Sequence, residues 1–158
     1  EAKKMNIISF LVTNGTLPER LEALEAKPFQ LYVTLPAPNK KIYAQTCQPS
    51  TGKLWEKLME TLELLNSFDC RKVIRLTLVK GLNMEDPEEY AKLIDKANPD
   101  FVEAKGYVHV GESQKRLPID AMPYHEDIVE FSKELEKHSS FKIKDESKPS
   151  RVVLLAKD

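Results

Sequence analysis

Polar side chains stand where the apolar runs of this 158-residue sequence end. In parallel α/β sheets and barrels, ligands bind at the carboxyl ends of the strands. Residues at these points are therefore candidates for binding a small molecule and for its chemistry. They are Thr13, Asn14, Thr34, Lys80, Asn83, Lys105 and His109.

Glu103 and Lys105 are two residues apart, so they lie on the same face of a strand. A buried lysine beside a glutamate could hold the carboxylate of a ligand, and the same two residues could equally form a structural ion pair. By the same alternation, Arg75, Thr77 and Val79 share one face of the preceding strand. If the strands form a barrel, we expect both sets to point inward.

The cysteines and histidines do not form a recognisable metal site. Cys47 and Cys70 are too few for a disulfide framework and too far apart for a local metal knuckle, so structural thiols are the favoured interpretation. His109, His125 and His138 show neither an HExxH motif nor another paired spacing typical of zinc ligands. We predict no metal ligands in this sequence.

The elements that must position these residues alternate between short apolar runs and amphipathic helices. This alternation favours parallel βαβ units over a β-sandwich or a helix bundle. Pro36 and Pro38 stop the second run, because proline donates no hydrogen bond to a neighbouring strand. The predicted strands are Ile7–Val12, Phe29–Leu35, Val73–Val79, Phe101–Val110 and Val152–Ala156.

Four helices are expected between or after these strands. A capping box formed by Thr16 and Glu19 begins a short helix, and an apolar stripe predicts another from about Gly52 to Asn66. Asp86 and Pro87 occupy N-cap and first-turn positions before a third helix. The last helix has an inner face marked by Ile128, Phe131 and Leu135.

Length and composition fit one globular domain that spans residues 1–158. The sequence has 24 Lys and Arg against 25 Asp and Glu, so no long-range field gathers nucleic acid, and any RNA contact must be a local patch. No apolar run approaches the roughly 20 residues needed to span a bilayer, and no signal sequence opens the chain. We expect a cytoplasmic protein without a membrane partner.

Four motifs carry a family resemblance: FLVTNGT at 10–16, QLYVTLPAP at 30–38, VIRLTLVKGLN at 73–83 and NPDFVEAKGYVHVGES at 98–113. Together with MPYHEDIVEF at 122–131, they resemble the tRNA 4-demethylwyosine synthases, radical SAM lyases of wybutosine biosynthesis. The resemblance implies an α/β fold, namely a partial (β/α)6 TIM-like barrel with parallel strands alternating with helices. This sequence would form its C-terminal half, without the first strands and the cluster loop.

The resemblance also implies two cofactors and two substrates for the parent enzyme. A CxxxCxxC loop holds a 4Fe-4S cluster that binds S-adenosyl-L-methionine. Radical chemistry then condenses a two-carbon unit of pyruvate with N1-methylguanosine next to the anticodon of tRNA-Phe. Because the CxxxCxxC motif is absent from this sequence, we expect the chain alone to be inactive and to contribute no cluster ligands.

Site residues follow from the matching motifs. Lys105 and Glu103 would be catalytic, and Lys115 and Arg116, in the loop after the fourth strand, would contact tRNA unless they are ordinary solvated charges. The expected cofactor-binding residues are Thr13, Asn14, Thr34, Arg75, Thr77, Lys80 and Asn83.

The sequence departs from the family at two positions. Pro36 stands where relatives usually carry an aspartate, and Gln48 precedes Pro49 where an arginine is usual. Since the lost groups have opposite charges, we hypothesise that they form a pair in relatives and were lost together.

Three functions remain open. The chain is part of a wyosine synthase, or one subunit of a split enzyme whose partner chain supplies the N-terminal half-barrel, or a non-catalytic tRNA- or nucleotide-binding half-barrel. The first is favoured, because the segment Ile7–Val12 contains no charge or proline that would discourage another strand from pairing with its edge.

Overall fold

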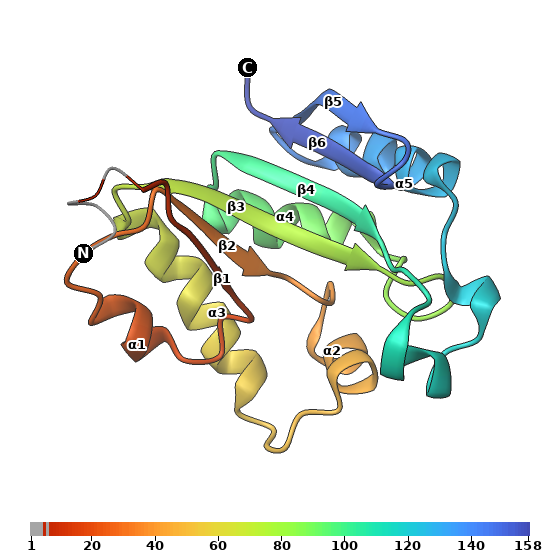
Figure 1. The fold of residues 1–158 in the computed structure, drawn as a ribbon, viewed down its shortest axis with the longest axis horizontal. Helices are drawn as coiled ribbons and strands as arrows, with labels where there is room; N and C mark the ends of the chain where they lie inside the picture. The colour runs from red at the N-terminus through yellow and green to blue at the C-terminus, as the bar shows by residue number, and fades with distance from the viewer. Residues whose placement is uncertain (1–4, 6) are drawn as a thin grey trace.

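A single six-stranded sheet organises the computed structural model, which describes residue 5 and residues 7–158. The first four strands are parallel, and the last two are antiparallel to their neighbours. Across the sheet, the strands are β1 (Phe10–Thr13), β2 (Gln30–Thr34), β3 (Arg71–Leu78), β4 (Phe101–Gly106), β6 (Val152–Ala156) and β5 (Lys142–Ser147) (Figure 1).

Helices cover one face of this sheet and leave the other open in the described part of the chain. Figure 1 shows α3, α4 and α5 behind the strands and α2 beyond the carboxyl end of β2. The α-helices are α1 (Pro18–Glu22), α2 (Lys40–Cys47), α3 (Leu54–Leu64), α4 (Pro87–Ala97) and α5 (His125–His138).

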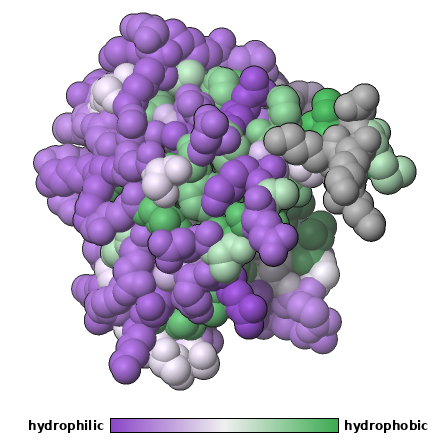
Figure 2. All heavy atoms as spheres, turned by 90° about the vertical axis from the view of Figure 1, so that its left-hand side faces the viewer, coloured by the Kyte–Doolittle hydropathy of each residue, from purple (hydrophilic) through white to green (hydrophobic). Residues whose placement is uncertain are grey.

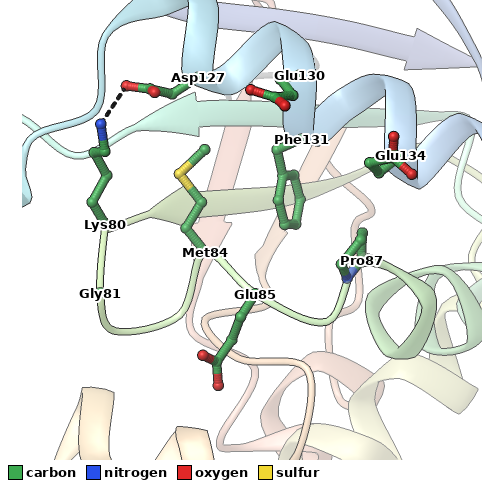
Figure 3. A pocket seen from close by; sticks show the side chains of 9 residues that line it. All are labelled: Lys80, Gly81, Met84, Glu85, Pro87, Asp127, Glu130, Phe131 and Glu134. Carbon is green, nitrogen blue, oxygen red and sulfur yellow. Dashed lines mark hydrogen bonds and ion pairs between the residues drawn. The ribbon is translucent and has the colours of Figure 1, made fainter.

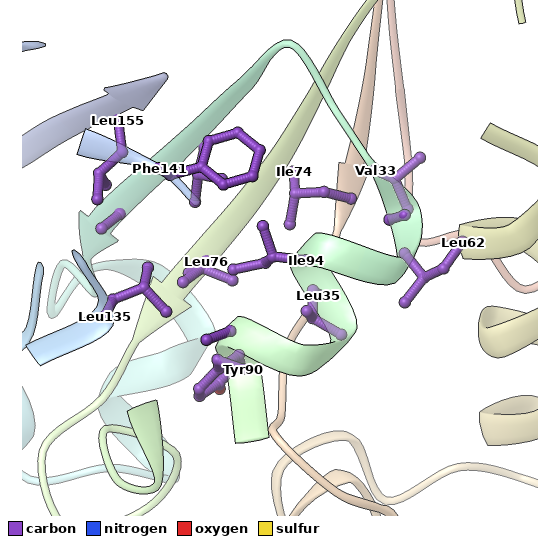
Figure 4. Close-up of a cluster of buried hydrophobic side chains, with 14 of the residues drawn as sticks. Val33, Leu35, Leu62, Ile74, Leu76, Tyr90, Ile94, Leu135, Phe141 and Leu155 are labelled. Carbon is purple, nitrogen blue, oxygen red and sulfur yellow. The ribbon is translucent and has the colours of Figure 1, made fainter. Parts of the chain in front are cut away.

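The core forms between the helices and alternate residues of the strands. Ile74, Leu76 and Leu78 of β3 are fully buried and pack with Leu62 of α3 and Ile94 of α4 (Figure 4). Burial of each such side chain contributes about 1.5–3 kcal/mol.

Between these buried positions, the strands turn charged and polar side chains to the open face. Arg75, Thr77, Glu103 and Lys105 lie on this open face and are partly exposed. The alternation predicted from sequence is therefore confirmed for these four residues, whereas Val79, predicted to share their face, lies beyond the end of β3 and is buried with Tyr107 and Ala121.

The end of the sheet has a different topology from the one predicted. The segment Val152–Ala156 is a strand, as predicted, but it runs antiparallel to β4. β5, which the sequence did not predict, precedes it with only the turn at 148–151 between them. So short a connection permits a hairpin but no parallel crossover. Mostly exposed residues form β5, which explains why no apolar pattern marked it.

Some predicted boundaries also change. Residues 7–9 are not part of β1, and the strand predicted to reach Val110 ends at Gly106. α2 was not predicted, and it begins directly after the two prolines that end β2, where the Asn39 side chain accepts a hydrogen bond from the Ile42 N–H at 3.0 Å. Proline stopped the strand, and asparagine then capped a new helix.

Two predicted helix caps are made differently. Thr16 hydrogen-bonds Asn14 instead of capping α1, whose N-cap is Leu17. Asp86 occupies the N-cap position of α4, as predicted, without a side-chain capping bond.

The two ends of the sheet differ in character. Figure 2 shows the end where β1 to β4 begin, with hydrophobic atoms among hydrophilic ones. A hollow of about 410 Å³ at this end is lined by Ile7, Ile8, Phe29 and Cys70. The polar residues predicted for the site lie at the opposite, carboxyl end or on the open face. Among the described residues, no helix is long and apolar enough to cross a membrane.

Candidate functional site

A cavity of about 360 Å³ lies at the carboxyl ends of β1 and β2. Asn14 and Thr34, which were predicted from sequence to bind a ligand, both line it. So do Pro36 and Gln48, the two positions at which we expect the sequence to depart from the family. Tyr43 of α2 supplies an aromatic wall. The structure thus brings together four positions that the sequence separates by as many as 34 residues.

A tight turn after β1 presents Asn14 to this cavity. The Asn14 Oδ1 accepts hydrogen bonds from the N–H and the hydroxyl of Thr16 at 3.2 and 2.8 Å. The Thr13 hydroxyl accepts from the Gly15 N–H at 3.1 Å. Within the described residues, the N–H groups of the Asn14 amide have no protein partner, so they can donate to a ligand.

An ion pair crosses the open face between β3 and β4. Arg75 Nε lies 2.8 Å from Glu103 Oε1, and the guanidinium carbon lies 4.5 Å from the centre of the Tyr32 ring. Glu103 is therefore paired with Arg75, and the structural ion pair between Glu103 and Lys105 that the sequence left open does not form. Lys105 is opposite Thr77 of β3 and Val152 of β6, and it has no ion pair among the described residues.

Lys80 belongs to a different part of the molecule from the Asn14 cavity. Its ammonium lies 3.0 Å from Asp127 Oδ2 of α5 and lines a second cavity, of about 330 Å³, between the β3–α4 loop and α5 (Figure 3). Glu130 and Glu134 extend the acidic side of this cavity, and Met84 lies on its apolar side. The structure does not bring Lys80 to Asn14 and Thr34.

The side chain of Asn83 forms three hydrogen bonds with backbone groups. Its Oδ1 accepts from the Val79 N–H at 2.7 Å, and its Nδ2 donates to the Pro36 and Thr77 carbonyls at 2.8 and 2.9 Å. The residue is 1% exposed. Asn83 therefore ties the ends of β2 and β3 together, and direct cofactor contact would require these bonds to be broken.

The loop after β4 carries the two basic residues predicted to contact RNA. Lys115 pairs with Glu112, with its Nζ 2.9 and 3.0 Å from the two carboxylate oxygens, and Arg116 is exposed. Both side chains are accessible at the carboxyl end of the sheet, on a surface of mixed charge.

A hydrogen-bonded relay beside this loop was not predicted from sequence. The Tyr107 hydroxyl donates to Ser113 Oγ at 2.9 Å, and Ser113 donates to the Val110 carbonyl at 2.5 Å. Because the hydroxyl proton of Tyr107 is donated to Ser113, the Tyr107 oxygen can only accept from His109 Nδ1, which lies 3.2 Å away. His109 Nδ1 is therefore the donor. The relay orients the imidazole, and the alternation of Tyr107 and His109 was its only sequence signal.

The cysteines do not fit an iron-sulfur cluster. Cys70 lies where β3 begins, whereas Cys47 lies in α2 beyond the opposite end of the sheet. Loss of hydration raises the pKa of both thiols above their usual value, which disfavours the thiolate that binds iron. No group of three or more His, Cys, Asp or Glu side chains suits a metal ion among the described residues.

Comparisons with known proteins agree with this geometry. The sequence model of the radical SAM superfamily matches residues 1–94, and the model of wyosine base formation matches residues 96–157. The S-adenosyl-L-methionine-dependent tRNA 4-demethylwyosine synthase of Pyrococcus abyssi is 50% identical over 100% of this chain and 47% of its own length. The human synthase TYW1 is 38% identical over 82% of this chain and 18% of its own length.

The fold is also found in a solved structure. A structure of TYW1 with a lysine-pyruvate adduct bound aligns with a TM-score of 0.87 and 34% identity, covering 98% of this chain and 48% of that one. The described fold therefore resembles part of a radical SAM barrel. The chain spans about half the length of the archaeal relative that it matches.

Proposed function

Because this chain belongs to the radical SAM superfamily and, within it, to the tRNA 4-demethylwyosine synthases, we propose that it forms the substrate- and cofactor-binding half of such an enzyme. The reaction would condense a two-carbon unit of pyruvate with N1-methylguanosine beside the anticodon of tRNA-Phe. The observation that carries the proposal is the cavity shared by Asn14 and Thr34 at the carboxyl ends of parallel strands. Ligands bind at this end in barrels and open α/β sheets.

S-adenosyl-L-methionine would bind in this cavity. The Asn14 amide and the Thr34 hydroxyl can hydrogen-bond its ribose or methionine part, and Tyr43 offers an apolar wall. Thr13 supports the turn that presents Asn14, and Thr77 and Arg75 extend the polar surface along β3. When bound to a reduced 4Fe-4S cluster, this cofactor supplies a radical. The residues described here would bind and orient its organic part.

Lys105 is assigned to the carboxylate of pyruvate. Its ammonium is on the open face with no ion pair in the described chain, while the negative charge of Glu103 is already balanced by Arg75. An anionic ligand beside Lys105 would therefore gain a charge-assisted hydrogen bond. The lysine-pyruvate adduct in the related TYW1 structure supports pyruvate as the ligand class, without identifying the lysine in this chain.

The cluster ligands must come from outside the described residues. We propose that they belong to an N-terminal half-barrel, in the same polypeptide or in a separate chain, that covers the open face. Phe10 and Val12 of β1 are 59% and 54% exposed on this face, which supports such a cover. Since the proposed substrate is tRNA, we also propose a cytoplasmic location.

Restoring the family's charged pair tests the cofactor site. We expect the double variant Pro36→Asp and Gln48→Arg to bind S-adenosyl-L-methionine more tightly than the sum of the single changes in binding free energy predicts, because both side chains line one cavity. Isothermal titration calorimetry of the wild type, both single variants and the double variant measures this coupling. Additive effects would reject the pairing, and no binding by any of the four proteins would argue against a cofactor site here.

Charge reversal tests the RNA side. We expect Lys115→Glu with Arg116→Glu to weaken binding of tRNA-Phe and to reduce the slope of log affinity against log salt by about two. Filter binding over a series of salt concentrations provides the measurement. The matched control is Lys133→Glu with Lys137→Glu on the exposed side of α5, where the slope should not change. Equal effects in both double variants would mean that only the overall charge matters.

A further inference from the structure

Tyr124 is a tyrosine whose ring the fold leaves exposed. It is 68% exposed, whereas Tyr43, Tyr90 and Tyr107 are between 0% and 8% exposed. A large aromatic side chain in water forgoes the stabilisation that burial would give it. Its position directly before α5, at the carboxyl end of the sheet, places it on the side of the molecule that carries the proposed site.

Hydrogen bonds hold the backbone at Tyr124 in place. Its backbone N–H donates to Asp127 Oδ2 at 2.7 Å, and the same oxygen lies 3.0 Å from Lys80 Nζ. The Lys80 backbone N–H in turn donates to the Ala121 carbonyl at 2.9 Å, which ties the segment before Tyr124 to the end of β3. Figure 3 shows Lys80 and Asp127 meeting across the space between the β3–α4 loop and α5.

The ammonium group of Lys80 lies close to the Tyr124 ring. Lys80 Nζ lies 5.7 Å from the centre of the Tyr124 ring, within the range of a cation–π interaction. Lys115 and Arg116 are in the loop between β4 and this segment, and they are exposed. The neighbouring carboxylates of Asp127 and Glu112 are paired with Lys80 and Lys115. Lys80 is still partly exposed beside the exposed Tyr124 ring, and the loop before this segment adds the exposed Lys115 and Arg116, which could contact a phosphate.

We propose that Tyr124 is a stacking platform for an unpaired base of the RNA substrate, with Lys80 beside it near the phosphate backbone. Unpaired bases bind proteins chiefly by stacking on aromatic rings, whereas phosphates contact basic side chains. Positive and negative groups are nearly balanced here, so stacking contributes more to affinity than charge does. This inference rests on the proposed function, because that function supplies the RNA.

The test compares RNA binding by proteins that keep the aromatic ring at position 124 and by one that lacks it. The anticodon stem-loop of tRNA-Phe, labelled with a fluorophore, is titrated with the wild type, Tyr124→Phe and Tyr124→Ala, and binding is followed by anisotropy. Tyr124→Phe should bind like the wild type, because the ring is kept, and Tyr124→Ala should weaken binding about 5- to 100-fold. The stem duplex without its loop should bind all three proteins equally, since it presents no unpaired base.

Ile119→Ala is the matched control, because Ile119 is also 68% exposed and lies five residues away. It should leave stem-loop binding unchanged, and equal losses for Ile119→Ala and Tyr124→Ala would overturn stacking in favour of a general apolar contact. Equal binding by Tyr124→Ala and the wild type would overturn the inference and leave the proposed function intact. No stem-loop binding by the wild type would overturn both. Unchanged thermal unfolding of Tyr124→Ala establishes that any loss is not due to misfolding.

Discussion

Replacing Asn83 with alanine is expected to lower the free energy of unfolding by about 3–5 kcal/mol. Three hydrogen bonds to the backbone of Val79, Pro36 and Thr77 are lost together, and the Val79 N–H is left buried without a partner. Urea denaturation followed by circular dichroism measures the change. The same substitution should loosen the end of β2, because the Pro36 carbonyl loses the donor that holds it.

Asn66→Ala is the matched control. The Asn66 amide also donates two hydrogen bonds to backbone carbonyls, at 3.1 and 3.2 Å, but it is exposed. Water replaces these bonds at once, so we expect a loss below about 1 kcal/mol. If both variants lost the same stability, burial would not be the reason that Asn83 matters.

Gly15→Ala is expected to cost about 2–5 kcal/mol, by two additive causes. Gly15 has a φ of +70°, which an L-residue adopts only with strain. A Cβ at this position would lie 2.8 Å from Leu58 Cδ1 and 3.1 Å from Val33 Cγ1, and both of these residues are fully buried. Thermal and urea unfolding both report the loss.

Two other glycines separate the causes. Gly81 has a φ of +72°, and no atom lies within 4 Å of the place that a Cβ would take, so Gly81→Ala should show only the backbone cost of about 1–2 kcal/mol. Gly52 has neither feature, and Gly52→Ala should be close to neutral. A Gly15→Ala variant no less stable than Gly81→Ala would show that α3 can move away from the turn.

These two residues, Gly15 and Asn83, matter for the site because they support residues that line it: Gly15 lies between Asn14 and Thr16, and Asn83 binds the carbonyl of Pro36. Gly15 allows the turn after β1 to approach α3, where its carbonyl accepts a hydrogen bond from the Thr61 hydroxyl at 2.6 Å. Asn83 holds the opposite side, at the end of β2. The cavity that contains Asn14 and Thr34 lies at the ends of the same two strands. Stability and cofactor binding should therefore fall together in variants of either residue.

Much of the fold could be predicted because the apolar pattern reports burial directly. β2, β3 and β4 alternate between core and open face, and α3, α4 and α5 carry the apolar stripes that cover the core face. α2 and β5 were missed for one reason. Few of their residues face the core, so neither has a strong apolar period.

The candidate site was predicted in part. The motifs identified Asn14 and Thr34, and the structure places both in one cavity. Sequence proximity suggested that Glu103 interacts with Lys105, but Glu103 pairs with Arg75 on the adjacent strand. Similarly, Lys80 interacts with Asp127, which is 47 residues away, and Asn83 with Pro36, also 47 residues away. Partners across strands and loops depend on sheet register, which local patterns do not specify.

By itself, the sequence determined the order of most elements, the two faces of the central strands and the family to which the chain belongs, because these depend on local periodicity and on motifs read in order. Only the tertiary structure decided which charged side chains form ion pairs, that the Asn83 side chain hydrogen-bonds to the backbone, and that the Tyr124 ring is exposed to solvent. These features depend on residues far apart in the chain, such as Arg75 and Glu103 or Lys80 and Asp127, whose contact exists only after the sheet and its helices have packed.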